Sequence, residues 1–272
     1  SDFISRDLSW LEFNRRVLDQ AQNEERNLFD RLKFLAITTS NLDEFFTIRV
    51  GNLYNYIDYG KERVDYSGLR ELPFRKELLR KVQDFVVAQN ACFTNQLIPL
   101  LADQDINFVK PSDLAASELA AVASYFERTV YPMLTPMLFD YTHVFPVLQA
   151  KVLIFGVVTQ VSGSTSEEDR KVSFVQIPAE RDEETLLLPI EEIVRSEIKR
   201  LYRNVEIVSA SLMRIIRNGD FTLEENDDIE ADFIDEIRQK IKNRRLGRVV
   251  RMEVEPGFSE EVLDLLKKRW EL

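Results

Sequence analysis

Apolar residues recur at helical spacing along the first hundred residues of the chain. The run Ser9-Trp10-Leu11-Glu12 has the form of a capping box and predicts the start of a helix. A second helix is predicted over residues 28–37, and a long later one begins near Phe74. The apolar stripe of this long helix consists of Leu78, Val82, Phe85, Val86, Cys92, Phe93, Leu97 and Leu100. Residues 1–105 therefore predict an N-terminal helical bundle.

The stretch TTSNLDEFFTIRV, residues 38–50, predicts a further helix start, at Asn41. Asparagine is a favourable N-cap residue, and Glu44 stands three positions later, where a carboxylate can complete a capping box. Apolar residues follow at helical spacing. Local physics alone makes Asn41 a helix cap.

The pattern changes after Asp105. Residues 106–109 are strand-like, a helix is predicted from about Ser117 to Pro132, and the β-branched residues of 150–161 predict a central strand. The run VSFVQIP is its expected hairpin partner. Further strands are predicted over 185–188, 205–216 and 248–254, and further helices from Pro189, over 228–246 and over 259–270. The expected fold class is α+β: a helical domain over 1–105, then a head domain over 106–272 with a mostly antiparallel sheet. Residues 60–73 are expected to form a loop.

Composition narrows the classes of function. The 272 residues carry a formal net charge of −11, which argues against a broad surface for nucleic acid. No segment has the apolar length of a transmembrane span, and the first residues lack the pattern of a signal peptide, so a cytoplasmic location is expected. The single cysteine, Cys92, lies in a helical pattern and is interpreted as a small buried hydrophobe.

Catalytic constellations are not evident in the sequence. It has no glycine-rich phosphate loop and no zinc-binding spacing, and its one histidine, His143, lies between two prolines with no orienting partner in the pattern. The acidic run 224–230 lacks the pattern of a calcium loop and is better interpreted as the start of a helix. We therefore predict no catalytic residue and no metal ligand in this chain.

One basic cluster stands out on the acidic background. It consists of Lys240, Lys242, Arg244, Arg245, Arg248 and Arg251. Arginine forks match phosphate oxygens, so the cluster could hold an anion or make a dimer contact. Cations at a helix C-terminus are also favourable without any ligand, and a regular strand would point Arg248 and Arg251 to opposite faces.

Several stretches together resemble one family. They occur in the same order and at similar spacing as the motifs of the N-terminal and head domains of bacterial polyphosphate kinases, which make long-chain polyphosphate from ATP. The stretches are RDLSWLEFNRRVLDQA, NLFDRLKFLAITTSNLDEFFTIRV, YPMLTPMLFDYTHVFP, IIRNGDF and RRLGRVVRMEVE. The resemblance covers nearly the whole chain. The run Ile215 to Asp220 departs from that of many relatives, and no role is carried over to it.

This resemblance implies a function that is larger than the chain. In the family, ATP phosphorylates a histidine of C-terminal domains, with magnesium, and the phosphate passes reversibly to polyphosphate. Those domains, with the catalytic histidine and the magnesium ligands, are expected to lie beyond Leu272, so this chain is expected to be inactive by itself. The one site residue carried over is Asn41, in the S-N-L-D-E-F motif, expected to bind ATP near its base.

The resemblance also implies partners. The head domain is expected to mediate a homodimer or higher oligomer, and the enzyme to be cytoplasmic and peripheral to the inner membrane. The alternative is a stand-alone, non-catalytic dimerisation or interaction module in which Asn41 only caps a helix.

Overall fold

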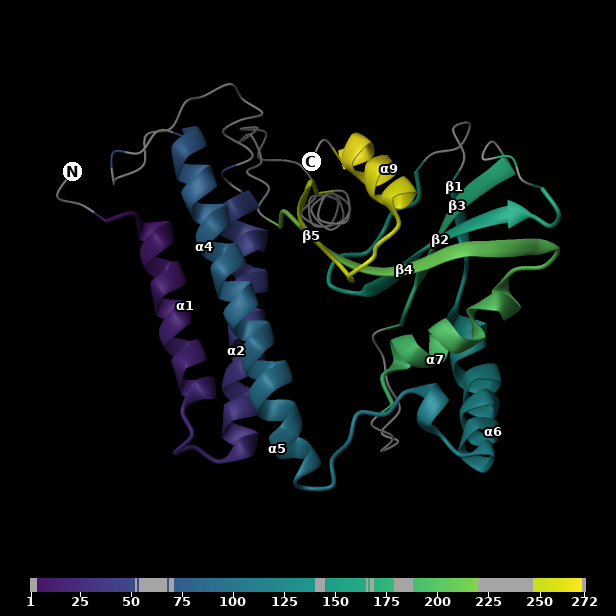
Figure 1. Cartoon of the computed structure of the whole chain (residues 1–272). Coiled ribbons are helices and arrows are strands. Elements are labelled where there is room, and N and C mark those ends of the chain that lie inside the picture. The colour runs from purple at the N-terminus through teal and green to yellow at the C-terminus, as the bar shows by residue number, and fades with distance from the viewer. Residues whose placement is uncertain are drawn as a thin grey trace, which may run out of the picture. The chain divides into compact units, whose positions relative to one another are not determined.

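The computed structural model describes residues 4–51, 53, 68, 71–139, 145–164, 166, 169–178, 188–219 and 247–270. They divide into two compact units. Unit 1 comprises Ser1–Asn107 with Asn218–Glu224, and unit 2 comprises Phe108–Arg217 with Glu225–Leu272. Unit 1 is helical and unit 2 contains the sheet, so the predicted α+β class is confirmed (Figure 1).

Unit 1 is built from helices that pack lengthwise (Figure 1). They are α1 (Arg6–Gln22), α2 (Leu28–Phe45), α4 (Glu71–Cys92) and α5 (Ile98–Ala102), with π-helical turns η1 (Phe46–Val50) and η2 (Phe93–Leu97). The described core residues include Leu11, Leu18, Leu35, Leu42, Phe45, Leu78, Phe85, Cys92 and Leu97. The ring of Trp10 stacks on that of Phe45 with centroids 4.6 Å apart. The helical bundle predicted for this part of the chain is confirmed.

The helix starts predicted at Ser9 and Asn41 are wrong. The first helix begins at Arg6, where Ser5 Oγ accepts a hydrogen bond from the Leu8 N–H at 3.4 Å. The second is capped by Asn27, whose Oδ1 accepts from the Asp30 N–H at 2.9 Å, and it continues through Asn41 to Phe45. Asn41 is therefore no cap, and Glu44 closes no capping box. The buried stripe of α2 continues on both sides of Asn41, and packing of that stripe overrides a local capping preference.

The π-helical turn η1 accounts for a glycine far away in the sequence. The Gly51 N–H is directed to the carbonyls of Ile48 and Phe46 rather than to that of Thr47. The Thr47 carbonyl instead accepts a hydrogen bond from the Gly219 N–H at 2.9 Å. A Cβ at position 219 would lie 2.5 Å from Thr47 Cγ2, so this contact requires glycine.

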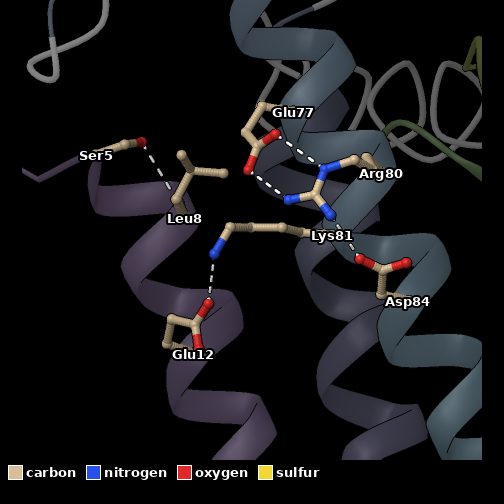
Figure 2. A network of polar contacts seen from close by, with 7 residues as sticks. All are labelled: Ser5, Leu8, Glu12, Glu77, Arg80, Lys81 and Asp84. Carbon is tan, nitrogen blue, oxygen red and sulfur yellow. Dashed lines mark hydrogen bonds and ion pairs between the residues drawn. The ribbon is translucent and has the colours of Figure 1, made fainter.

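Charged side chains of unit 1 pair on its surface (Figure 2). Lys81 Nζ on α4 lies 2.6 Å from Glu12 Oε1 on α1, and the Arg80 guanidinium bridges Glu77 and Asp84 along α4, with 2.8 Å to each carboxylate. These pairs are exposed, so they contribute little to the free energy of folding.

Unit 2 contains a five-stranded antiparallel sheet of order β1-β3-β2-β4-β5 (Figure 1). Its strands are β1 (Met137–Phe139), β2 (Leu153–Val161), β3 (Arg170–Gln176), β4 (Val205–Arg217) and β5 (Val249–Val254). Its helical segments are η3 (Pro111–Asp113), α6 (Ala116–Tyr125), η4 (Phe126–Val130), η5 (Tyr131–Met133), α7 (Ile190–Glu197), η7 (Ile198–Leu201) and α9 (Glu260–Trp270).

Apolar side chains fill both faces of this sheet. Alternating residues of β2 point to opposite faces, because successive side chains of a strand alternate. Phe155 and Val157 pack with α6, η4 and α7 on one face, and Ile154 and Val158 pack with α9 on the other. The two apolar layers fix α6 and α7 on one face of the sheet and α9 on the opposite one (Figure 1).

Most strands of unit 2 follow the sequence pattern. The central strand, its hairpin partner and the strands predicted over 205–216 and 248–254 are confirmed, as are the helices expected near Ser117, after Pro189 and over 259–270. The strand predicted over 106–109 is wrong, since these residues form no regular element, and β1 was not predicted. The predicted helix over 228–246 lies outside the described residues. So do most of the strand over 185–188 and of the loop over 60–73, whose last three residues belong to α4.

Candidate functional site

Asn41 lies inside α2, four residues before its last residue, Phe45, and its side chain is partly exposed. Its Nδ2 donates a hydrogen bond to Asn14 Oδ1 on α1 at 3.0 Å. The described residues give Asn41 Oδ1 no hydrogen bond. The only site residue carried over from the sequence therefore has one end of its amide held by the protein and the other end available.

Asn14 is fully buried and determines how the Asn41 amide is oriented. The Asn14 Nδ2 donates to the main-chain carbonyl of Thr38 at 3.1 Å. A carbonyl oxygen can only accept, so it selects the NH2 end of Asn14. The oxygen of Asn14 then faces Asn41 and can only accept from it. The hydrogen-bond pattern thus settles which end of each amide is which.

A second buried amide completes this polar cluster. Gln89 Nε2 on α4 donates to the hydroxyls of Thr38 at 2.8 Å and Thr39 at 2.9 Å. The Thr38 hydroxyl in turn donates a hydrogen bond to the Leu35 carbonyl at 2.6 Å. We call Asn14, Thr38, Thr39, Asn41 and Gln89 the amide cluster. It joins three helices of unit 1 by directed hydrogen bonds.

Sequence reasoning identified Asn41 but missed Asn14, Thr38 and Gln89. A signal was present. Each of these three residues occupies the buried stripe of its helix, at the spacing of its apolar neighbours: Leu11, Asn14, Leu18 and Ala21; Leu35, Thr38, Leu42 and Phe45; Val82, Phe85, Gln89 and Cys92. A polar residue at such a position needs a partner, because burying it alone costs free energy. Three such positions on three helices indicate a shared polar layer.

Two titratable side chains of unit 1, Cys92 and Arg31, are buried. Burial raises the pKa of the Cys92 thiol, and the nearby Arg31 cation opposes this only partly, so the thiol stays protonated at neutral pH. Arg31 itself is buried and donates to the Ala21 carbonyl at 2.8 Å and to Gln96 Oε1 at 2.8 Å. The interpretation of Cys92 as a buried hydrophobe agrees with this environment.

The other sequence candidates lie elsewhere or outside the described residues. His143, the acidic run 224–230 and four members of the basic cluster fall in the second group. Arg251 is described: its Nη2 lies 2.5 Å from Glu253 Oε1, and the same carboxylate pairs with Arg214 at 2.9 Å. This arginine is therefore neutralised within the sheet and does not present a free fork to a phosphate.

A hollow of about 600 Å³ lies beside the first turn of α9 in the described part of unit 2. Its lining consists of Arg170, Val208, Ser209, Ser259, Glu260 and Glu261. Arg170 Nη1 lies 3.6 Å from Glu261 Oε2, so the positive charge is met within the hollow. Among the described residues no group of histidine, cysteine, aspartate or glutamate is arranged to hold a metal ion, and no described helix is long and apolar enough to cross a membrane.

The fold and the site together define a class of protein. A helical unit with a partly exposed amide at the edge of a buried polar layer is suited to hydrogen-bond a ligand, and the α+β unit next to it along the chain has a filled apolar core. The family model of the polyphosphate kinase N-terminal domain matches residues 3–109, and that of the polyphosphate kinase middle domain matches residues 117–272. The chain belongs to the polyphosphate kinase family.

Individual relatives agree with this assignment. The chain is 32% identical over 286 residues to polyphosphate kinase 1 of Chlorobaculum tepidum, covering 99% of this chain and 40% of that protein. It is 33% identical over 276 residues to the polyphosphate kinase of Lactiplantibacillus plantarum, covering 98% of this chain and 38% of that protein. The chain thus spans about two fifths of the length of the curated relatives it matches.

A solved structure shares the fold. The crystal structure of polyphosphate kinase from Porphyromonas gingivalis superposes with a TM-score of 0.75 at 20% sequence identity, over 100% of this chain and 38% of that one. Because the match covers the whole chain, the similarity in fold includes both units.

Proposed function

We propose that this chain is the N-terminal and middle part of an enzyme that reversibly transfers the terminal phosphate of ATP to polyphosphate. The observation that carries the proposal is the match of both family domains, in order, along the chain. The transferring step, a phosphohistidine intermediate and the magnesium ions are assigned to residues outside this chain. Phosphoryl transfer needs concentrated positive charge around the phosphate, and the chain has a net charge of −11.

Within this function, the part that the described residues support is a contact to the nucleotide. Asn41 lies in the S-N-L-D-E-F motif, is partly exposed and keeps its Oδ1 without a partner among the described residues. An amide in this state can hydrogen-bond to a base. We assign Asn41 to binding the base of ATP, and unit 2 to contacts between copies of the enzyme in the cytoplasm.

The test of the nucleotide contact is a titration of ATP into the pure chain by calorimetry. We expect measurable binding that is weakened at least about tenfold in Asn41→Ala, which is the loss of one or two hydrogen bonds to a desolvated partner. Asn90→Ala is the matched control, because Asn90 is an exposed asparagine of α4 in the same unit. Equal affinity of all three proteins, or no binding by any, would remove Asn41 from the nucleotide site.

Two further measurements bear on the rest of the proposal. The pure chain should neither hydrolyse ATP nor lengthen polyphosphate, so synthesis that is abolished by a single substitution in this chain would contradict the assignment of catalysis elsewhere. Sedimentation equilibrium tests the oligomer: a monomer at all concentrations would contradict contacts through unit 2 alone.

A further inference from the structure

The Asn41 amide is not free to choose which of its ends it presents. Either end of an asparagine can face a ligand when the side chain is unconstrained, because the amide carries an acceptor oxygen and a donor nitrogen of nearly equal size. Here the Nδ2 end is committed to Asn14 at 3.0 Å. The oxygen end is therefore the one directed away from the helix contact, together with the second N–H of the amide.

The constraint originates at a main-chain carbonyl. The Thr38 carbonyl selects the NH2 end of Asn14 at 3.1 Å, the Asn14 oxygen is left to face α2, and it accepts from Asn41. Reversing the Asn41 amide would bring two acceptor oxygens together. Reversing both amides would bring Asn14 Oδ1 against the carbonyl. Since Asn14 is fully buried, no water replaces either lost hydrogen bond.

Thr38 is itself held in place from a third helix. Its hydroxyl accepts from Gln89 Nε2 at 2.8 Å and donates to Leu35 at 2.6 Å. The carbonyl that orients Asn14 thus belongs to a residue whose side chain is also fixed. The sequence of contacts runs from the core to the surface and ends at the oxygen of Asn41.

We propose that Asn14 is a positioning residue that locks Asn41 with its oxygen outward, so that the site selects purines that carry an amine at position 6 over purines that carry an oxygen there. The inference rests on the proposed function, since it gives the specificity of the nucleotide contact at Asn41. An outward oxygen accepts from the 6-amine of adenine, and the remaining N–H can donate to an adjacent ring nitrogen. A 6-oxopurine would oppose its oxygen to that of Asn41.

The test compares ATP with inosine triphosphate, which differs from ATP at the 6 position and the adjoining ring nitrogen. We expect the pure chain to prefer ATP by about tenfold or more, the usual discrimination of an oriented amide. Asn14→Leu removes both hydrogen bonds of Asn14 while keeping a similar volume. In this variant the Asn41 amide can turn, and the preference should fall to about threefold or less, with inosine triphosphate binding more tightly than to the original chain.

Asn14→Asp is the conservative variant. A buried aspartic acid that is protonated can donate from its hydroxyl to Thr38 and accept from Asn41 through its other oxygen, which reproduces the pattern of Asn14. We expect this variant to restore the preference for ATP even if it unfolds more easily. A merely structural role of Asn14 would instead make both variants lose affinity for the two nucleotides alike.

A second readout needs no nucleotide. In the free chain the side-chain NH2 signals of Asn41, observed by nitrogen-15 NMR, should exchange slowly with water, and faster in Asn14→Leu. Slow exchange together with an unchanged nucleotide preference in Asn14→Leu would overturn the specificity role. Slow exchange without any ATP binding would overturn the proposed function of Asn41 and the inference with it, while leaving the geometry of the amide cluster intact.

Discussion

The two units bury very different side chains. The buried polar residues described in unit 1 include amides and charged groups: Ser5, Asp7, Asn14, Arg31, Thr38, Asp43, Gln89 and Asn218. Those described in unit 2 are hydroxyl residues only: Thr159, Ser173 and Ser211. Amides and charges are expensive to bury and persist where directed hydrogen bonds satisfy them. Unit 1 therefore places hydrogen-bonded amides and charged groups, which fix the orientation of side chains, where unit 2 has apolar residues.

The difference fits two tasks. A sheet covered on both faces by apolar layers holds its shape through packing, which is insensitive to the direction of any one bond. A helical bundle that fixes a partly exposed amide needs direction as well as packing. The amide cluster supplies it, through hydrogen bonds of 2.8–3.1 Å from Gln89 and Asn14 to Thr38.

The largest effect is expected where unit 2 relies on packing. Phe155→Ala should lower the free energy of unfolding of unit 2 by about 3–5 kcal/mol, because Phe155 is fully buried in the central strand. Phe108→Ala, at a side chain of unit 2 that is 47% exposed, is the matched control and should lower the free energy of unfolding of unit 2 by less than about 1 kcal/mol.

The chain has two tryptophans, one in each unit, so each unit can be followed separately. Trp10 stacks on Phe45 in unit 1, and Trp270 lies edge-on to Phe145 in unit 2, with centroids 6.0 Å apart. In a Trp10→Phe background, urea unfolding observed by fluorescence reports unit 2. A midpoint for Phe155→Ala equal to that of the parent would show that the sheet does not depend on this layer.

The next largest effect on stability is expected in unit 1, at the buried hydrogen bonds of the amide cluster. Gln89→Leu keeps an apolar core possible but removes the donor to Thr38 and Thr39, so we expect unit 1 to lose about 1–3 kcal/mol. The measurement is urea unfolding in a Trp270→Phe background. The matched control is Gln83→Leu, the same change at an exposed position of α4. If the leucine at 89 stabilised unit 1, the cluster would be dispensable for folding and its retention would point to ligand binding alone.

The same contrast explains what the sequence could predict. The strands of unit 2 follow from alternating and β-branched residues because their packing is apolar, and β2, β3, β4 and β5 were all expected. In unit 1 two polar residues were misinterpreted as helix caps, and three buried polar residues were missed. Ser9 and Asn41 resemble caps, yet both lie inside helices, since burial of the stripe outweighs about 1 kcal/mol of capping preference.

The partners of Asn41 could not be identified from spacing alone. Asn14 and Gln89 are distant from it in the chain. A polar residue on an apolar stripe indicates that a hydrogen-bond partner exists, but its position in the sequence does not identify that partner. The π-helical turn η1 was equally hidden, because the residue that uses its freed carbonyl, Gly219, is far along the chain from Thr47.

Alkaline pH should lower the stability of the two units at different pH values. Burial raises the pKa of Cys92 in unit 1 and that of Tyr202 in unit 2, where a hydrogen bond with Ser173 at 2.6 Å opposes the shift. Between its unfolded and its higher folded pKa, each group is deprotonated only in the unfolded state, so the free energy of unfolding falls as pH rises. For the thiol this begins above about pH 8.5 and for the phenol above about pH 10.

We therefore expect unit 1 to weaken before unit 2 as pH is raised. Thermal unfolding with each single-tryptophan background, from pH 7 to 10.5, measures both. Cys92→Ala should flatten the curve of unit 1 and Tyr202→Phe that of unit 2. A loss of both units at one pH, unchanged by these substitutions, would assign the alkaline effect to surface charge instead.

The smallest effect on stability is expected at the surface of unit 1, where an ion pair joins two helices but its side chains are not buried. Lys81 and Glu12 join α4 to α1 at 2.6 Å, much as the amide cluster joins the same helices, but their side chains are 29% and 56% exposed (Figure 2). Water and salt screen such a pair, so a double-mutant cycle with Lys81→Ala and Glu12→Ala should give a coupling of about 0.2–1 kcal/mol. The coupling should fall further in 1 M salt, whereas the effect of Gln89→Leu should not. A surface coupling as large as that of Gln89 and independent of salt would mean that burial is not what gives the amide cluster its strength, and the contrast between the units would have to rest on packing alone.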